Sequence, residues 1–363
     1  MPIVVIFLIS SLRLGGQERQ IYSLLQNNER LAISPILVIW SHDSNNLSYL
    51  SRIEKLNVKI IKLNKHKNFL LKTLNFCYII HKNRPKIVFS YSFFTNIIVY
   101  ISTRFFKTTP LGSIRSSYSY SVKHSGKILA SLCFRYPRIQ ISNNYSVINK
   151  LSEVSFWKPK KTYLVNNVID EKIFNYHKIP EKNGVFRIIG VGSLVEVKRW
   201  DILLKVAKKL LEENILFKVD IFGDGPEFNN LQGFINKYDL QNCCLINKSR
   251  IDIYNEIIKS NVLIHTSDDE GCSNVILEAM SIGRPVISTR TGDASRMIKN
   301  GENGFLVNRD DVTSITKAVL ELFYDRNLCK KMGDFGSQVA KKNYSIEQFN
   351  ISISQVFNET TQR

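Results

Sequence analysis

Cysteines and long apolar runs are both scarce in this sequence, and these shortages exclude several classes of protein. Six cysteines are spread over 363 residues without a CxxC pair. We therefore expect reduced thiols rather than a disulfide framework or a zinc site. No stretch reaches the ~18 consecutive apolar residues of a membrane-spanning helix. The opening MPIVVIFLISSL lacks the positive start and the cleavage site of a secretory signal, so we interpret it as a buried first strand.

Acidic residues are scarce in the first half of the chain. Residues 1–180 contain 26 lysines and arginines but only 7 aspartates and glutamates. Residues 181–363 contain 24 residues of each sign, so the first half carries the whole net charge of +19. This excess favours an anionic partner, such as nucleic acid, an acidic lipid surface or a phosphorylated substrate. A solvated basic surface without any partner is the plain alternative.

Short apolar runs alternate with helical patterns along the chain, which predicts parallel sheets covered by helices. We expect strands at 3–9, 34–40, 58–63, 87–91, 111–115, 138–142, 187–194, 216–223, 243–246, 261–265, 285–289 and 304–307. Helices are expected near 17–27, 67–82, 93–106, 124–136, 201–213, 226–237, 252–259, 274–282 and 293–299. The fold class is α/β, with two doubly wound Rossmann-like domains that face each other across a cleft.

The domain boundaries follow from polar connections. We predict a first domain at 1–170, a linker at 171–184, a second domain at 185–340 and a C-terminal crossover helix at 341–363 that packs back on the first domain. In such α/β folds ligands bind beyond the carboxyl ends of the strands.

The stretch HTSDDEGCSNVILE, residues 265–278, is the strongest candidate for a site. Ser273 or Asn274 can cap a helix that begins near Val275, which places Glu278 in its first turn. Free N–H groups at that helix start attract anions, and carboxylates at Glu270 and Glu278 can accept hydrogen bonds from sugar hydroxyls. Taken alone, the same residues also fit a solvated turn and a partner for the helix dipole.

The wider sequence around these acids resembles a known family. EGCSNVILEAMSIGRPVIST, residues 270–289, is similar to the donor-binding signature of the retaining, family-4 glycosyltransferases with the GT-B fold. Further similar motifs occur in family order: GGQER at 15–19, VGSL at 191–194 with Lys198, GDGPE at 223–227 and NGENGFL at 300–306. NVID at 167–170 with Phe174 is similar to the family motif at the domain junction. The resemblance covers about residues 1–357 and is thin between 30 and 165.

This resemblance implies roles for individual residues. It places Glu278 on the ribose hydroxyls of a nucleotide-sugar donor, Glu270 on the donor sugar and Lys198 on the donor diphosphate. Glu270 and Lys198 are the expected catalytic residues, because a cation beside the leaving diphosphate stabilises the transition state. The remaining donor-binding residues are expected to be Gly16, Ser193, Arg199, Gly271, Cys272, Ser273, Asn274 and Val275.

Several positions depart from the family pattern. Ser193 stands where relatives have an arginine, and either Arg199 or the Ser193 hydroxyl is expected to replace it. Gly15 and Gly16 are expected to let the backbone approach the diphosphate or the acceptor. We favour Arg115 over His124 as the cleft residue of the first domain.

No metal or cofactor is expected, since Asp268 and Asp269 lack the spacing of an Asp-x-Asp metal motif and fit an exposed turn better. The loop at 289–296 also departs from the pattern, with Asp293 in place of a glycine and Arg296 in place of a glutamate. We expect this loop to keep its fold through Gly292, but its family contacts do not carry over.

Together with the resemblance, these features predict a metal-independent hexosyltransferase of bacterial surface polysaccharide synthesis. The resemblance alone implies that the anomeric configuration is retained, that the acceptor-binding domain is 1–170 and that the nucleotide-sugar-binding domain is 185–340. We expect it to be cytoplasmic and peripheral on the inner face of the cytoplasmic membrane, with a lipid-linked or oligosaccharide acceptor. Residues 65–84 and 92–107 are amphipathic and basic, so either could lie on an anionic bilayer, although we favour packing of their apolar faces on the sheet. The alternatives are transfer to a soluble acceptor, a basic nucleic-acid-binding protein and a non-enzymatic scaffold.

Overall fold

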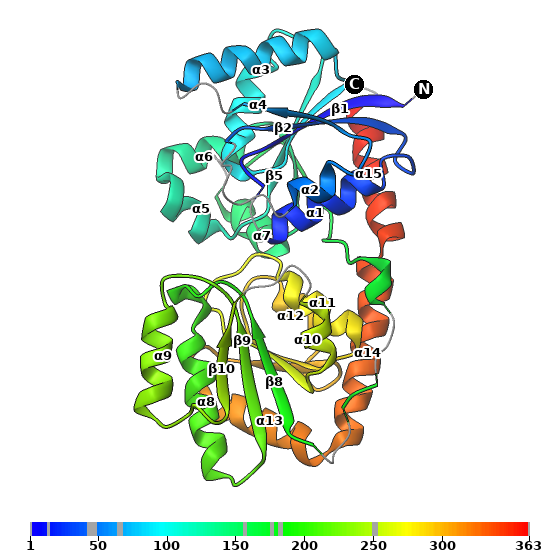
Figure 1. The fold of residues 1–363 in the computed structure, drawn as a ribbon. Coiled ribbons are helices and arrows are strands. Elements are labelled where there is room, and N and C mark those ends of the chain that lie inside the picture. Colours follow the sequence, from blue (N-terminus) through cyan, green and yellow to red (C-terminus); the bar gives the residue numbers. More distant parts are fainter. Residues whose placement is uncertain are drawn as a thin grey trace. The chain divides into compact units, whose positions relative to one another are not determined.

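A computed structural model of the chain describes residues 2–12, 15–41, 49–63, 68–154, 158–174, 178–180, 184–248 and 253–361. The chain divides into two compact units, Met1–Val168 with Ile346–Arg363, and Ile169–Ser345. Each unit has a central parallel sheet between helices (Figure 1). Within the described ranges, no helix is long and apolar enough to cross a membrane.

The first unit contains a seven-stranded sheet in the order β3-β2-β1-β4-β5-β6-β7, with every neighbouring pair parallel. Its strands are β1 (Ile3–Ile9), β2 (Ile33–Ile39), β3 (Lys59–Lys62), β4 (Ile87–Ser90), β5 (Thr109–Ile114), β6 (Ile139–Ser142) and β7 (Lys161–Leu164). Its helices are α1 (Gly16–Gln26), α2 (Leu50–Ile53), α3 (Phe69–Asn83), η1 (Phe93–Thr95), α4 (Asn96–Ser102), α5 (Tyr118–Ser125), α6 (Lys127–Arg135), α7 (Tyr145–Glu153) and α15 (Ile346–Thr361).

The second unit contains a six-stranded parallel sheet in the order β10-β9-β8-β11-β12-β13. Its strands are β8 (Phe186–Val191), β9 (Phe217–Phe222), β10 (Cys244–Asn247), β11 (Val262–His265), β12 (Val286–Thr289) and β13 (Gly304–Val307). Its helices are η2 (Glu171–Ile173), η3 (Glu196–Lys198), α8 (Trp200–Glu212), α9 (Phe228–Lys237), α10 (Tyr254–Ile258), α11 (Asn274–Ile282), α12 (Ala294–Met297), α13 (Val312–Tyr324) and α14 (Arg326–Tyr344).

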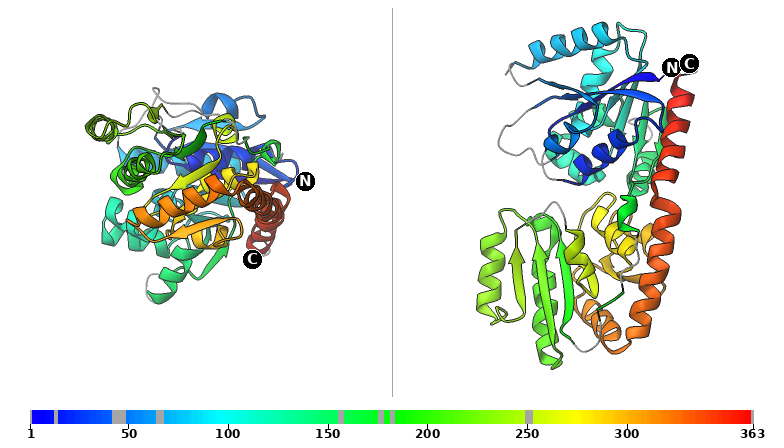
Figure 2. Two further views of the ribbon diagram at one scale, coloured as in Figure 1. Left: turned by 90° about the horizontal axis from the view of Figure 1, so that it is seen from below. Right: turned by 45° about the vertical axis from the view of Figure 1, so that its right-hand side comes forward.

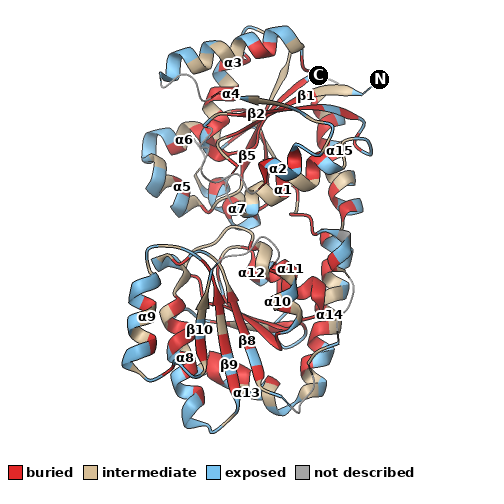
Figure 3. Cartoon of the chain, in the orientation of Figure 1, coloured by how far each residue is buried: buried red, intermediate tan, exposed pale blue. Residues whose placement is uncertain are grey.

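Both sheets are buried on two faces, which explains the continuous apolar runs of their strands. In β1, alternate residues enter different cores: Phe7 lies with Phe89 on one face, while Ile6 lies with Val88 on the other. The central strands are accordingly buried, whereas the edge strands β3 and β7 are partly exposed, and the helices expose their outer faces (Figure 3). The two-domain α/β fold class predicted from the sequence is confirmed.

The C-terminal helix α15 belongs to the first unit, as the predicted fold class required (Figure 2). Phe357 is 2% exposed and lies edge-on to Phe89, with ring centroids 6.4 Å apart. Glu359 accepts hydrogen bonds from Tyr163 and Lys161 of β7. Two different kinds of contact therefore hold this helix on the sheet that the N-terminal part of the chain builds.

The unit boundaries differ from the predicted domain boundaries by a few residues. The second unit already begins at Ile169, because Ile169 and Ile173 pack in its core. It includes residues 169–174, 178–180 and 184, while 175–177 and 181–183 of the expected linker lie outside the described residues. The chain passes to the first unit at Ser345, where an extended backbone separates α14 from α15.

Candidate active site

The strand order places a ligand site at the centre of the second sheet. The order reverses between β8 and β11, which are paired side by side in parallel. In a doubly wound sheet, ligands bind beyond the carboxyl ends of the strands at this reversal. Lys198 lies in η3 after β8, and Glu270 lies in the loop after β11. The topology thus brings together two residues that are 72 positions apart.

Lys198 and Glu270 form an ion pair through the lysine Nζ and the carboxylate Oε1. Both side chains are 19% exposed, so the pair remains accessible from one side. The same carboxylate oxygen lies 3.2 Å from His265 Nε2 and 3.4 Å from Ser267 Oγ. Glu270 is therefore the centre of a small polar cluster at the end of β11.

His265 was not assigned a role in the sequence analysis, although it opens the motif. It is the last residue of β11, and its side chain is 2% exposed. Its Nδ1 lies 3.1 Å from Ser288 Oγ on β12, which fixes the ring while Nε2 faces Glu270. The available signal was its place at the carboxyl end of a central strand, where side chains face the ligand edge.

Glu270 carries a negative charge that its surroundings stabilise. Burial by itself raises the pKa of this carboxyl, but the Lys198 ammonium and the His265 hydrogen bond outweigh burial and hold the pKa well below its usual range. Glu270 is consequently ionised at neutral pH. It can accept hydrogen bonds from hydroxyl groups but has no proton to donate.

Backbone contacts fix the two loops that carry this pair. Thr266 Oγ1 donates to the Lys198 carbonyl at 2.8 Å, and the Asp268 N–H donates to the Val197 carbonyl at 2.9 Å. Gly292 has φ of +49°, and a Cβ there would lie 2.2 Å from the Gly271 carbonyl oxygen. The loop at 289–296 therefore needs glycine at this position, because a side chain would push against the backbone beside Glu270.

Glu278 lies in α11 but one residue beyond its first turn, which corrects the predicted position. The helix begins at Asn274, with Ser273 at its N-cap in an extended conformation and without a side-chain capping bond. Glu278 is 1% exposed, whereas the helix start is half-buried. Glu278 lies outside the first turn because the helix starts one residue earlier than the motif suggested.

The remaining predicted donor residues of the second unit lie along the same edge. Ser193 is exposed, and its carbonyl accepts the Trp200 indole N–H at 3.0 Å. The loop and first turn before Glu278 consist of half-buried residues and one buried serine: Gly271, Cys272, Ser273, Asn274 and Val275.

Arg199 faces acidic side chains rather than open solvent. Its guanidinium forms ion pairs with Asp201 at 3.0 Å, with Asp268 at 3.1 Å and with Asp310 at 2.6 Å. Hydrogen bonds to Asp201, Asp310 and Asp268 raise its pKa despite some burial. These partners fix Arg199 beside the site and already balance its charge, and they show that Asp268 is an ion-pair partner rather than a residue of a free turn.

The predicted residues of the first unit lie at the carboxyl edge of its own sheet. Gly15 is the N-cap of α1 with φ of −168°, an extended value open to any residue, and Gly16 begins the helix. Arg115 follows β5 directly and stacks on the Tyr91 ring, with Cζ 4.0 Å from the centroid. Within the described part of the chain, the Arg115 Nε and one terminal nitrogen are buried without a hydrogen-bond partner.

His124 occupies a different place from the one predicted. The expected helix at 124–136 corresponds to α6 and to the last two residues of α5, and Gly126, with φ of +76°, separates these two helices. His124 lies in the last turn of α5, not at a helix start, and its ring is 4.1 Å from that of Tyr120. Glycine at this φ ends α5, because other residues rarely adopt it.

Asp293 and Arg296, which depart from the family pattern, form an ion pair at 3.3 Å. Among the residues that the structure describes, no three His, Cys, Asp or Glu side chains are grouped so that they could hold a metal ion.

The fold and this edge define the class of the protein. A crystal structure of Anabaena Alr3699/HepE in complex with UDP and glucose is similar with a TM-score of 0.84 at 16% identity, over 98% of this chain and 99% of that one. Two Rossmann-like domains of this kind form the GT-B fold of glycosyltransferases, as the sequence predicted. Residues 170–339, nearly the whole second unit, match the family described as glycosyl transferases group 1. This range of the chain is therefore similar to that family, in agreement with the resemblance seen in its motifs.

Two similar proteins are named as glycosyltransferases. The uncharacterized glycosyltransferase MJ1178 of Methanocaldococcus jannaschii is 25% identical over 246 residues, which are 68% of this chain and 63% of that protein. The capsular polysaccharide biosynthesis glycosyltransferase CapM of Staphylococcus aureus is 28% identical over 214 residues, 56% of this chain and 54% of that protein. The matched regions thus span less than two thirds of the length of these relatives.

Proposed function

We propose that this protein transfers a sugar from a nucleoside-diphosphate sugar to a glycan acceptor. The Lys198–Glu270 pair carries the proposal, because it lies at the strand reversal where this fold binds ligands and within the range that matches the group 1 glycosyltransferases. A cation, an ionised carboxylate and a helix start at one sheet edge suit a ligand that combines phosphate with hydroxyl groups.

The donor would use each of these groups for a different part of its structure. The Lys198 ammonium and the N–H groups of Asn274 and Val275 bind the diphosphate. Glu278 accepts hydrogen bonds from the ribose hydroxyls, and Glu270 from those of the transferred sugar. UDP is the first nucleotide to test, since the structure of the similar Anabaena protein contains UDP.

In the reaction, the bond from the anomeric carbon to the diphosphate oxygen breaks and a bond to an acceptor hydroxyl oxygen forms. Negative charge develops on the leaving diphosphate, and Lys198 stabilises it in the transition state. Because this charge is met by an ammonium and by a helix start, we propose transfer without a metal ion. Retention of the anomeric configuration is proposed from the family resemblance.

We propose that the first unit binds the acceptor and that the acceptor is a lipid-linked glycan of surface polysaccharide synthesis, at the inner face of the cytoplasmic membrane. The basic excess of residues 1–180 favours a diphosphate-linked lipid and an acidic membrane surface. The Arg115 nitrogens that lack partners within the described chain suit an anionic group. The capsular polysaccharide role of the CapM relative supports the same pathway class.

A thermal-shift screen against UDP-, GDP-, ADP-, CMP- and dTDP-sugars in EDTA tests the donor site. A donor at about a hundredfold its Kd adds about 2.7 kcal/mol to folding stability. Glu278→Gln should weaken donor binding about tenfold or more, the loss of a hydrogen bond to a charged group. Glu321→Gln on α13, an exposed carboxylate of the same unit, is the matched control. An identical shift in wild type and Glu278→Gln would refute the site assignment, and transfer to a soluble acceptor alone would refute the lipid-linked one.

A further inference from the structure

Helix α3 exposes an apolar face that the first unit does not cover. Its inner side packs on the sheet through Phe76, Ile79 and Ile80. Its outer side carries five large apolar residues that are 49% to 63% exposed: Phe69, Leu70, Leu71, Leu74 and Tyr78. Spacings of three and four place most of them in one row along the helix. The predicted packing of the apolar face of this segment on the sheet is thus wrong for these five residues.

Two further apolar side chains extend this row. Ile101, at the end of α4, is 49% exposed, and Phe105, just beyond that helix, is 88% exposed. The middle of α3 adjoins the end of α4, since Cys77 Sγ lies 3.8 Å from the Ser102 carbonyl. We name the seven residues the α3 surface: Phe69, Leu70, Leu71, Leu74, Tyr78, Ile101 and Phe105.

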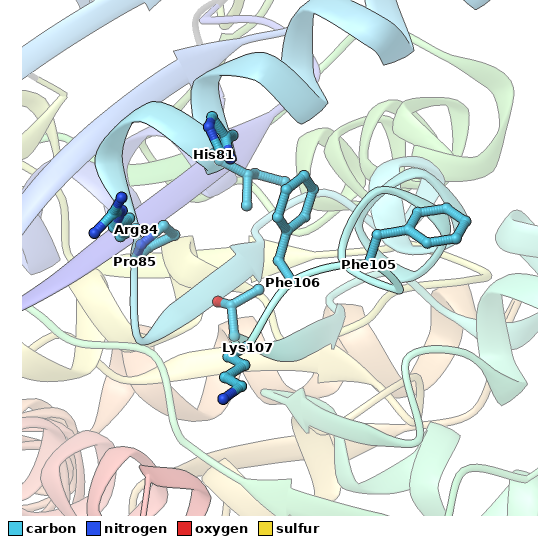
Figure 4. Close-up of a pocket in the computed structure, with 8 residues that line it drawn as sticks. His81, Arg84, Pro85, Phe105, Phe106 and Lys107 are labelled. Carbon is cyan, nitrogen blue, oxygen red and sulfur yellow. The ribbon is translucent and has the colours of Figure 1, made fainter.

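A basic pocket of about 260 Å³ opens beside the α3 surface (Figure 4). It lies between the end of α3 and the segment 105–108, and His81, Arg84 and Lys107 supply its polar lining together with Thr108. The rings of His81 and Phe106 are 6.2 Å apart across it. Within the described chain, the buried Thr108 hydroxyl has no hydrogen-bond partner. The lining residues include a guanidinium, an ammonium and a hydroxyl group, the kinds of group that donate to phosphate oxygens.

The surrounding charge has one sign. Residues 55–152 contain 17 lysines and arginines and no aspartate or glutamate. Around the pocket, Lys82, Arg84, Lys86 and Lys107 are exposed, and none of them forms an ion pair with any residue that the structure describes. The pocket and the α3 surface therefore lie in a positive field that no neighbouring side chain in this segment neutralises.

We propose that the α3 surface docks on an acidic phospholipid bilayer and that the pocket holds one lipid phosphate. Leucines and Phe105 would enter the acyl boundary while the flanking cations meet the headgroups, the arrangement of interfacial helices. Aliphatic side chains argue against nucleic acid, whose bases stack on aromatic rings. This inference deepens the proposed function and rests on it only for the presence of the acceptor at a membrane.

Co-sedimentation of the full chain with vesicles tests the docking. Vesicles of equal parts phosphatidylglycerol and phosphatidylcholine should bind the protein, and pure phosphatidylcholine vesicles should bind it far less. Leu74→Ser with Phe105→Ser should reduce partitioning at least about tenfold, because two apolar side chains no longer leave water. Arg84→Gln with Lys107→Gln should reduce it about thirtyfold and weaken its salt dependence.

Matched controls come from the second unit. Leu216 is 67% exposed, and Lys330 and Lys331 are exposed on α14, so Leu216→Ser and Lys330→Gln with Lys331→Gln should bind vesicles as the wild type does. Equal loss in these controls, or equal binding to neutral vesicles, would overturn the proposal. Self-association or RNA binding that disappears in Leu74→Ser with Phe105→Ser, without vesicle binding in the wild type, would assign the surface to another partner.

Donor binding separates this inference from the proposed function. The surface variants should keep the wild-type thermal shift with a nucleotide-sugar, because the α3 surface lies in the first unit and the donor residues in the second. If the protein binds vesicles but shows no thermal shift with any nucleotide-sugar, the transferase proposal alone would be refuted. A donor shift without vesicle binding would sink the docking alone.

Discussion

The two units of this protein share one sheet topology but carry opposite kinds of chemistry at its carboxyl edge. In both, the strand order reverses once beside the first strand of the unit. At that edge the second unit places an ammonium, a carboxylate and an imidazole in contact, Lys198, Glu270 and His265. Among its described residues, the first unit places two hydroxyl groups there, Ser10 and Ser92 at 3.1 Å, and the cation Arg115.

The two halves of the chain also differ in net charge. The second half is neutral overall and contains the matched family range, whereas the first half holds the entire positive excess. A neutral unit with a built ion pair suits a donor of defined chemistry, and a basic unit suits a large anionic surface. One scaffold can thus be specialised twice, through the residues at its strand ends and through the charge of its outer helices.

The largest expected effect concerns the helix that the C-terminus contributes to the first unit. Phe357→Ala should lower the stability of this unit by about 3–5 kcal/mol, because it leaves a cavity beside Phe89. Hydrogen exchange by mass spectrometry should show faster exchange in β1 and β4 but not in β8 and β9. Ile351→Ala, at a position 61% exposed on the same helix, should change neither. Uniform loss of protection in both units would contradict the separation drawn here.

The second effect concerns the ion pair of the second unit. Lys198→Met should reduce turnover about a hundred- to a thousandfold, the loss of one group that stabilises developing charge. Donor affinity should change less, because the helix start and Glu278 still bind. Lys209→Met, an exposed lysine of α8, is the control and should leave both quantities unchanged. Steady-state transfer assays measure the effect, and wild-type turnover in Lys198→Met would remove this residue from the reaction.

The sequence predicted the buried strands well because both of their faces are apolar. It missed β7, Lys161–Leu164, whose four residues are only half-buried at the sheet edge and show no apolar run. It missed most of α5, Tyr118–Ser125, whose sequence YSYSVKHS shows little apolar periodicity, and it began the following helix inside α5, at residue 124. Hydrophobic periodicity reflects which side chains are buried. Short edge strands and short helices contain too few buried residues to show a clear period.

The contacts within the candidate site could not be predicted from the sequence. Glu270 and Lys198 were found through motifs, yet their ion pair depends on the strand order, which brings 72 residues of separation to one contact. Either Arg199 or the Ser193 hydroxyl was expected to replace the missing arginine. Three carboxylates pair with Arg199, one from the first turn of α8 and two from separate loops. Such tertiary partners leave no local signal in the sequence.

The smallest expected effect is the pH dependence that Glu270 gives the second unit. Its pKa in the folded protein is held below the usual value by Lys198 and His265 despite burial, whereas in the unfolded chain it is about 4.3. Because the folded pKa is depressed, this stabilisation is fully present above about pH 4.3 and declines as the pH falls toward the folded pKa.

Glu270→Gln should therefore show a shallower loss of stability in acid than the wild type, by at most about 1.4 kcal/mol per pH unit. Urea unfolding followed from neutral pH to about pH 3.5 measures this slope, and Glu321→Gln should retain the wild-type slope. Parallel curves for wild type and Glu270→Gln would mean that the carboxylate is not held by Lys198 in solution, and the contrast between a donor edge built from charges and an edge built from hydroxyls would lose its main support.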